Sequence, residues 1–259
     1  MNLHYSTEGF VFKKEDRLEA DRIFSVFTRD FGRIGIFAKA IRKINSKLRG
    51  NIEIFYLSKV EFIQGKNRKT LTDTASIEKF KNIENIPENL GIAYKISDVL
   101  DSFIRGEEKD DNIFDLLDET FSKLNDLQFR TSPSYAAPND KFSLPADKQE
   151  LIYLYFLWNF VFILGHGPEL SRCSVCFQKL NPDNLCFSNK EGGIICKNCA
   201  GIKKDALMIK SDVVKILRII LKKDWDMLLK LKIEKSSQND LKRISEEYSQ
   251  YLLSNYSSH

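Results

Sequence analysis

β-branched and aromatic residues form short runs through the first 80 residues, and in the third run hydrophobic and polar positions alternate with a period of two, which is the pattern of β-strands. Turn signals such as Asp30-Phe31-Gly32 separate most of the β-branched and aromatic runs. These runs cover 10–13, 22–28, 33–41, 52–63 and 70–77. Five strands in so short a stretch are typical of a small closed barrel. We therefore predict a five-stranded OB-fold barrel over 1–80, a fold that binds oligonucleotides on its strand 2–3 face.

The third predicted strand distinguishes the two faces of the barrel wall. One face holds only apolar residues, and we predict it to be the barrel interior: Ile34, Ile36, Ala38 and Ala40. The other face holds a glycine and an aromatic ring between two cations: Arg33, Gly35, Phe37 and Lys39. Cations follow phosphates while a ring stacks on any base, so this face suits a single strand of nucleic acid. Packing of Phe37 against the next domain is the alternative interpretation of its ring.

Helical spacing of apolar residues replaces the alternation after residue 85. It predicts helices over 87–105, 112–124, 151–164, 213–221, 225–231 and 241–252. The run 151–164 is apolar on every side and carries Asn159; it is too short to cross about 30 Å of hydrocarbon, so it predicts the centre of a helical bundle. A stretch rich in Pro, Ser, Asn and Asp over 127–147 predicts a mobile connection. The chain is thus expected to be α+β, with the barrel at 1–80 and a helical domain at 81–259.

Charge adds to this picture, because the net charge of +4 over 259 residues is unevenly distributed. Residues 1–80 hold 16 Lys and Arg against 10 Asp and Glu, so all of the excess positive charge lies in the predicted barrel. Between residues 29 and 49 the cations face a single acid, Asp30: Arg29, Arg33, Lys39, Arg42, Lys43, Lys47 and Arg49. Such a block often marks nucleic-acid contact, and a solvated face that aids solubility is the alternative. Together with Phe37, these cations are the predicted nucleic-acid contacts.

Two C-x₂-C pairs stand nineteen residues apart: Cys173-Ser-Val-Cys176 and Cys196-Lys-Asn-Cys199. This spacing is typical of four-cysteine zinc sites, in which each pair forms a knuckle whose thiolates point to one side. Gly192-Gly193 predicts a turn between short strands at 185–187 and 194–195. We predict one structural Zn²⁺ held by these four cysteines in a zinc ribbon at 171–201. Two disulfides are the alternative, and a catalytic zinc is disfavoured because four thiolates leave no open position.

The remaining features limit the class of function. Cys186 lies between Leu185 and Phe187 on a predicted strand and is expected to be a small buried hydrophobe. Three scattered histidines, with no candidate triad and no closely spaced acidic pair, predict a protein that is not an enzyme. A nuclease or GTPase activator with the cysteine lobe as scaffold is the rival. The start of the chain lacks the segments of a signal peptide, so we expect a soluble, cytoplasmic protein.

The order of these features resembles the bacterial recombination mediator family RecO. The resemblance is carried by the stretches 8–12, 27–33, 38–47 and 164–176. It implies a DNA repair and homologous recombination mediator that binds single- and double-stranded DNA and anneals complementary strands. It also implies that the protein helps load the recombinase at gaps coated by single-stranded DNA-binding protein.

The resemblance further implies partners and contact residues. The partners would be RecR and the C-terminal tail of the single-stranded DNA-binding protein, in a bacterial, nucleoid-associated location. The implied DNA contacts are Arg33, Lys39, Arg42, Lys43, Lys47 and Arg49. A zinc-ribbon OB-fold factor that acts on RNA in transcription or translation is the alternative function.

Overall fold

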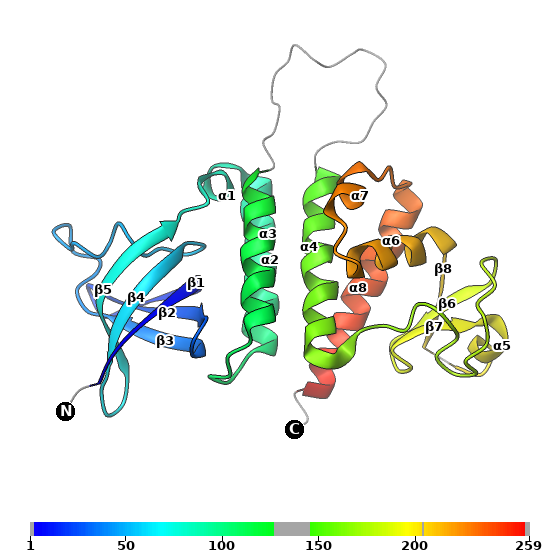
Figure 1. Ribbon diagram of the computed structural model, residues 1–259, viewed down its shortest axis with the longest axis horizontal. Coiled ribbons are helices and arrows are strands. Elements are labelled where there is room, and N and C mark those ends of the chain that lie inside the picture. The colour runs from blue at the N-terminus through cyan, green and yellow to red at the C-terminus, as the bar shows by residue number, and fades with distance from the viewer. Residues whose placement is uncertain (1–2, 127–145, 204, 257–259) are drawn as a thin grey trace, which may run out of the picture. The chain divides into compact units, whose positions relative to one another are not determined.

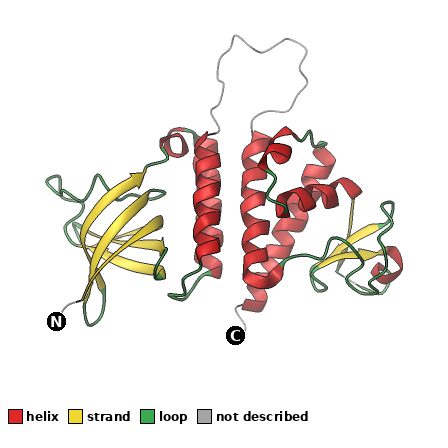
Figure 2. Cartoon of the chain, viewed as in Figure 1, coloured by secondary structure: helices red, strands yellow, loops and turns green. Residues whose placement is uncertain are grey.

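The structure is a computed structural model that describes residues 3–126, 146–203 and 205–256. The chain forms two compact units, Met1–Gln149 and Glu150–His259 (Figure 1). The strands of the first unit precede its helices, whereas in the second unit a small sheet is inserted between helices (Figure 2). Each unit therefore has its own architecture and its own candidate site.

Five strands build the barrel of the first unit: β1 (Leu3–Arg17), β2 (Asp21–Thr28), β3 (Gly32–Ala38), β4 (Leu57–Gln64) and β5 (Lys69–Glu78). They close in the order β1-β2-β3-β5-β4. Strands β3 and β5 pair in parallel, and the other neighbouring strands pair antiparallel. The five predicted strands are thus confirmed, but not all of their bounds: β1 extends far beyond the predicted 10–13, β3 ends earlier and β4 begins later than predicted.

Strand β3 ends earlier than the alternation predicts. Ala40 adopts a left-handed conformation with a φ of 53°, so the chain turns after Ala38. The predicted interior positions of the strand itself are buried: Ile34, Ile36 and Ala38. The prediction for Ala40 is wrong, because this residue lies in the turn and is only half-buried.

Strand β4 begins later than predicted, at Leu57 instead of Ile52. Phe55 has a φ of 67°, which interrupts the extended backbone between these residues. The loop is nevertheless fixed to the barrel, because the backbone N–H of Phe55 donates to the carbonyl of Val11 at 2.6 Å. Ile52 is 1% exposed and belongs to the barrel core. It is therefore apolar because it is buried, although it does not lie in a strand.

The helices of the first unit pack on the barrel through an aromatic cluster. They are α1 (Lys81–Asn85), α2 (Pro87–Phe103) and α3 (Asp111–Asp126). The ring of Phe10, in β1, lies 5.2 Å from that of Phe114 and 5.7 Å from that of Phe121, both on α3. Phe80 lies 5.8 Å from Phe121 in the same cluster. The barrel wall is therefore apolar on its interior and on the outer surface that the helices cover.

The second unit is organised around α4. Its helical elements are α4 (Ala146–Val161), the π-helical turn η2 (Phe162–His166), α6 (Ser211–Leu221), α7 (Trp225–Lys230) and α8 (Lys235–Tyr256). The predicted apolar run 151–164 is largely buried as far as Val161, whereas Phe162, in η2, is 57% exposed. Asn159 donates to the carbonyls of Tyr155 at 2.9 Å and Ile220 at 3.1 Å. These bonds explain how an amide is tolerated there. The connection predicted over 127–147 lies, as far as residue 145, outside the described residues.

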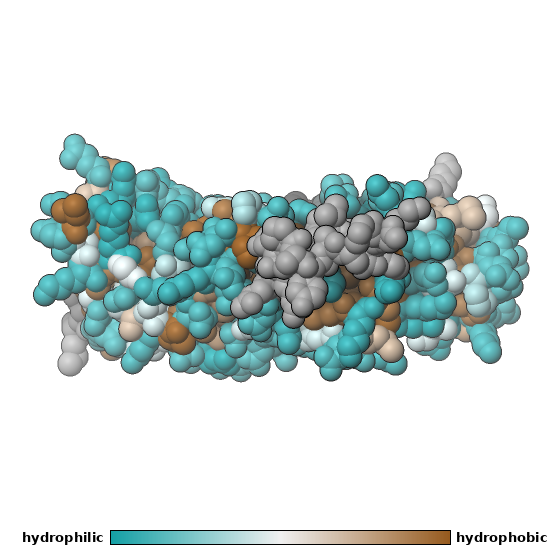
Figure 3. Space-filling view, turned by 90° about the horizontal axis from the view of Figure 1, so that it is seen from above, coloured by the Kyte–Doolittle hydropathy of each residue, from teal (hydrophilic) through white to brown (hydrophobic). Residues whose placement is uncertain are grey.

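Within the described ranges, no helix is long and apolar enough to cross a membrane. Hydrophilic side chains cover most of the surface seen in Figure 3, with hydrophobic residues scattered among them.

The cysteine lobe of the second unit is built on a three-stranded sheet of order β7-β6-β8. Its elements are β6 (Leu185–Ser188), β7 (Gly193–Cys196), α5 (Lys197–Ala200) and β8 (Ala206–Ile209). The ring of Phe187, on β6, lies 5.9 Å from that of Trp158 on α4 and 5.4 Å from that of Tyr248 on α8. Cys186 is 7% exposed, which confirms its prediction as a buried residue. The lobe is therefore packed onto the helices of its own unit.

Candidate metal centre and nucleic-acid interface

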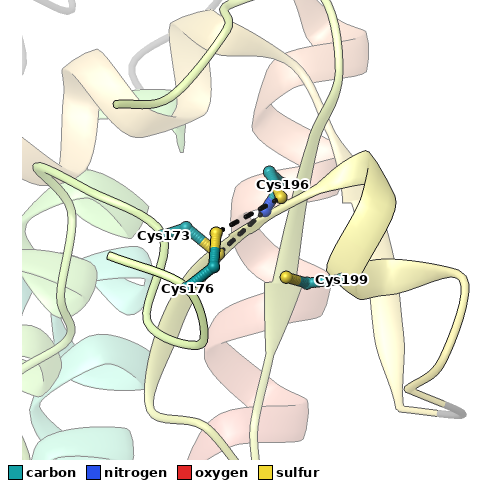
Figure 4. Close-up of side chains that lie close together, drawn as sticks. All are labelled: Cys173, Cys176, Cys196 and Cys199. Atoms are coloured by element: carbon teal, nitrogen blue, oxygen red, sulfur yellow. Dashed lines mark hydrogen bonds between the residues drawn. The ribbon is translucent and has the colours of Figure 1, made fainter. Parts of the chain in front are cut away.

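The four predicted metal ligands converge in the second unit (Figure 4). Cys173 and Cys176 come from the loop before β6, Cys196 ends β7, and Cys199 lies in α5. The sulfur atoms all lie within 4.8 Å of one another, although the two pairs are separated along the chain. The hairpin of β6 and β7 brings the second pair back to the first. These four cysteines could therefore hold one metal ion.

The surroundings of the cluster shift the pKa values of Cys173 and Cys199 in opposite directions. Burial raises the pKa of Cys173, but the backbone N–H groups of Cys176, Cys196 and Val175 outweigh burial and lower that pKa to about 6. The N–H of Cys196 donates to the Cys173 sulfur at 3.3 Å. Burial and the neighbouring thiols raise the pKa of Cys199 to about 12. The cluster thus stabilises the thiolate of Cys173 and disfavours that of Cys199, a conflict that a bound dication removes.

The donor set itself indicates the kind of metal. Four sulfur ligands with no oxygen donor are soft, so they suit Zn²⁺ or an iron–sulfur centre and disfavour Mg²⁺ and Ca²⁺. Since four protein ligands leave no position for a substrate, a metal bound here would be structural. Cys186 is not part of the set, and burial raises the pKa of its thiol.

Two of the predicted nucleic-acid contacts face the helices of the first unit. The guanidinium of Arg29 lies 4.1 Å from the ring centroid of Phe114 and 3.3 Å from the carboxylate of Asp115. The guanidinium of Arg33 binds the carboxylate of Asp101 and donates to the carbonyl of Ile104. Both cations therefore help to hold the helices on the barrel. The role of these two residues in nucleic-acid binding stays a prediction, and we leave them out of the candidate interface because the structure gives them partners on the helices.

The other predicted cations lie at the end of β3 and in the loop that leads to β4. We name this set the loop cations: Lys39, Arg42, Lys43, Lys47 and Arg49. Arg42 lies 3.5 Å from Asp16 and keeps 38% of its side chain exposed. The other members of the set are exposed and form no ion pair with a described residue. The structure thus leaves a group of cations open to solvent next to β3.

Phe37 is half-buried on the outer face of β3, where the guanidinium carbon of Arg68 lies 4.0 Å from its ring centroid. Arg68 reaches Phe37 because β5 pairs with β3, with Thr70 opposite Phe37. Sequence reasoning missed Arg68; the available signal was its place in a basic hairpin just after the turn 64–67. Gly35 is exposed, and a Cβ atom placed there would meet nothing within 4 Å. The outer face of β3 is therefore open beside an aromatic ring and a cation.

The fold and the two candidate sites define the class of this chain, a two-unit α+β protein with a basic barrel and a helical unit that carries a four-cysteine cluster. Residues 1–80 match the family description Recombination protein O N terminal, and residues 141–258 match Recombination protein O C terminal. The chain belongs to the RecO family.

Curated relatives match nearly the whole chain. The DNA repair protein RecO of Dehalococcoides mccartyi is 31% identical over 237 residues, which are 92% of this chain and 86% of the relative. The protein of the same name from Desulforamulus reducens is 26% identical over 249 residues, which are 96% of this chain and 90% of the relative. That of Roseiflexus sp. is 25% identical, again over 96% of this chain and 81% of the relative. The similarity thus covers both units.

Proposed function

We propose that this chain is a mediator of DNA repair and homologous recombination that binds single- and double-stranded DNA and anneals complementary single strands. The observation that carries the proposal is the set of loop cations, exposed beside β3 in a chain of the RecO family. The barrel is proposed to be an OB-fold that binds DNA on this side. Phe37 and Arg68 extend the interface, because a ring stacks on bases of any sequence while a cation attracts the phosphates.

The geometry supports a mechanism in which the protein aligns two DNA strands and no covalent bond is made or broken. Cations held on the barrel neutralise phosphates of one strand, which lowers the repulsion that a second strand meets. The base edges of the bound strand stay free to pair. The same role places the protein at gaps coated by single-stranded DNA-binding protein, where it helps load the recombinase. RecR and the C-terminal tail of the single-stranded DNA-binding protein are the proposed partners, on the basis of the family.

For the second unit we propose one structural Zn²⁺ bound by the four cysteines, which makes this lobe a zinc ribbon. The zinc would tie the two C-x₂-C pairs together and thereby contribute directly to folding. The chain's own residues prepare the site, because a backbone N–H already donates to the sulfur of Cys173.

Annealing of complementary oligonucleotides coated with single-stranded DNA-binding protein, with and without RecR, tests the function. The double variant Lys43→Gln, Lys47→Gln should anneal more slowly than the native chain. The matched control Lys222→Gln, Lys230→Gln removes the same charge from exposed positions of the second unit and should anneal normally. Equal rates for both double variants would contradict the proposed interface.

The salt dependence of DNA binding gives a second readout. If the loop cations and Arg68 each neutralise one phosphate, log K should fall against log salt with a slope of about −4 on single strands, at about −0.7 per contact. The slope should decrease by about 1.4 in the Lys43→Gln, Lys47→Gln variant. A slope near zero would refute the interface. Stronger binding to RNA than to DNA of the same sequence would favour the RNA-binding alternative.

A further inference from the structure

A cavity of about 400 Å³ lies at the root of the loop cations, between β1, β2 and the loop after β3. Four cations and one carboxylate line it together with a single apolar residue: Lys14, Arg22, Ile41, Arg42, Arg49 and Glu53. Lys14 and Arg22 come from the barrel strands, and neither belongs to the nucleic-acid contacts that the sequence predicts. The cavity therefore adds two cations that the loop alone does not supply.

Carboxylates orient these cations without matching their number. Arg22, whose side chain is 17% exposed, lies 2.8 Å from Asp16 through Nε and 3.4 Å from Glu53 through Nη1. The ammonium of Lys14 lies 2.6 Å from the other oxygen of Glu53. Asp16 and Glu53 thus serve three cations, since Arg42 also pairs with Asp16. Arg49 forms no ion pair with any residue that the structure describes, so positive charge is in excess.

We propose that this cavity binds a phosphate group of a nucleic-acid strand. Guanidinium groups present a planar fork of donors that matches phosphate oxygens. Arg49 offers such a fork, and Arg22, whose Nε and Nη1 face Asp16 and Glu53, offers its Nη2. Strand pairing with Ala38 of β3 fixes the backbone of Arg22, and the ion pairs with Asp16 and Glu53 orient its guanidinium before the ligand arrives. Since Asp16 and Glu53 are two carboxylates facing four cations, the ion pairs leave net positive charge at the cavity. The inference rests on the proposed function, because the loop cations bring the strand to the cavity.

Titration of the full chain with inorganic phosphate tests the cavity directly. The side-chain Nε–H signals of Arg22 and Arg49 are followed by NMR at constant ionic strength, with chloride as the reference anion. Phosphate should shift both signals to saturation, whereas chloride should not. Arg49→Gln should weaken phosphate binding about tenfold, since it removes charged hydrogen bonds. Lys47→Gln loses the same charge from the same loop but does not line the cavity, so it should change the affinity by less than about twofold.

Glu53→Gln should have the opposite effect on phosphate binding from Arg49→Gln. It keeps the shape of the side chain but removes the negative charge that competes for Lys14 and Arg22. Phosphate should therefore bind several-fold more tightly to this variant. Equal losses in Arg49→Gln and Lys47→Gln, or no gain in Glu53→Gln, would overturn the proposal.

Oligonucleotides distinguish the source of the phosphate. If Arg49→Gln weakens only strands that end in a phosphate, the cavity takes a terminal phosphate. Equal weakening for 5′-phosphorylated, 5′-hydroxyl and circular strands assigns it to an internal phosphodiester. If phosphate shifts the NMR signals no more than chloride does, the cavity is not a phosphate site. If DNA binding is intact in that case, the proposed function still stands. Saturable phosphate binding in a chain that binds no DNA would support the cavity as a phosphate site and contradict the proposed function.

Discussion

The guanidinium of Arg33, on β3, binds the carboxylate of Asp101 on α2, and the ammonium of Lys13 donates to the same carboxylate at 2.8 Å. Arg33 also donates to the backbone carbonyl of Asp101 at 2.9 Å and to that of Ile104. It therefore reaches the C-terminal end of α2, where carbonyls lack helical partners and the helix dipole attracts cations. Arg33, which lies on the strand face that the sequence predicts to contact nucleic acid, thus has a structural role in the first unit.

Arg33→Ala should destabilise the chain by about 2 kcal/mol, because carbonyl and carboxylate groups of α2 lose a charged donor that is only partly exposed. Its DNA affinity should stay close to that of the native chain. Lys43→Ala is the matched control and should show the reverse, with unchanged stability and weaker DNA binding. Urea unfolding and fluorescence anisotropy measure the two effects. Loss of DNA binding in Arg33→Ala with full stability would show that Arg33 belongs to the interface after all.

Low pH should weaken the ion pairs that Asp101 forms with Arg33 and Lys13. Burial raises the pKa of Asp101, but the hydrogen bond from Lys13 and the charge of Arg33 outweigh it and lower that pKa below the ordinary value of 3.8. A carboxylate whose pKa is depressed on folding stabilises the protein above its unfolded pKa and loses that effect as the pH falls through the folded value.

The difference in unfolding free energy between the native chain and Asp101→Asn should therefore be constant from neutral pH to about pH 4 and should close below that. Urea unfolding at a series of pH values measures this difference. As a control, the difference between the native chain and Gly91→Val should not follow the same curve, because Gly91 is an exposed position of α2 that does not titrate. A difference for Asp101→Asn that persists unchanged in strong acid would contradict the ion-pair assignment.

The parts of this structure that sequence predicted well follow from local rules. Alternation predicts the strands because successive side chains of a strand point to opposite faces, and Ile34 and Ile36 obey that rule. The spacing of Cys173 and Cys176, and of Cys196 and Cys199, predicts convergence because a metal knuckle needs two thiolates on one turn of chain.

The parts that sequence did not predict depend on contacts between distant residues. Alternation correctly puts Arg33 on the outer face of β3, but the helix that covers it supplies Asp101 from 68 positions away. Arg68 meets Phe37 only because β5 pairs in parallel with β3. The left-handed backbone of Ala40, which ends β3, has no signal in a residue type that ordinarily avoids this conformation.

Removal of one ligand tests the metal centre. Cys199→Ser should lose the metal, whereas Cys186→Ala, which changes a buried cysteine of the same lobe outside the cluster, should retain one zinc per chain. Structural zinc contributes about 10–16 kcal/mol in small peptides, compared with about 5–15 kcal/mol for the stability of a whole domain. Cys199→Ser or a strong chelator should therefore unfold the lobe.

Elemental analysis measures the metal, and tryptophan fluorescence reports the unfolding because Trp158 contacts Phe187 of the lobe. Iron in the purified protein would contradict the assignment as zinc. A chain that contains no metal, and whose melting temperature a chelator leaves unchanged, would contradict the metal centre as a whole.

Gly35 offers a test of the outer face of β3 that separates binding from folding. Space is open around it, and its φ lies outside the left-handed region, so a branched side chain fits without strain. Gly35→Val should therefore keep stability or raise it by up to about 1 kcal/mol, since valine favours strands. The added side chain stands beside Phe37, where a base would stack. Single-strand affinity should fall several-fold, because stacking on a ring contributes about 1–3 kcal/mol per base.

Gly91→Val is the matched control, because Gly91 is exposed on α2 with open space around it and lies away from the loop cations in the chain. It should leave DNA binding unchanged in fluorescence anisotropy titrations at fixed salt. Phe37→Leu should reproduce the loss seen in Gly35→Val, since it removes the ring and keeps an apolar side chain beside Arg68. If Gly35→Val and Phe37→Leu both bind single strands as tightly as the native chain, then DNA contacts only the loop cations, and the outer face of β3 does not take part.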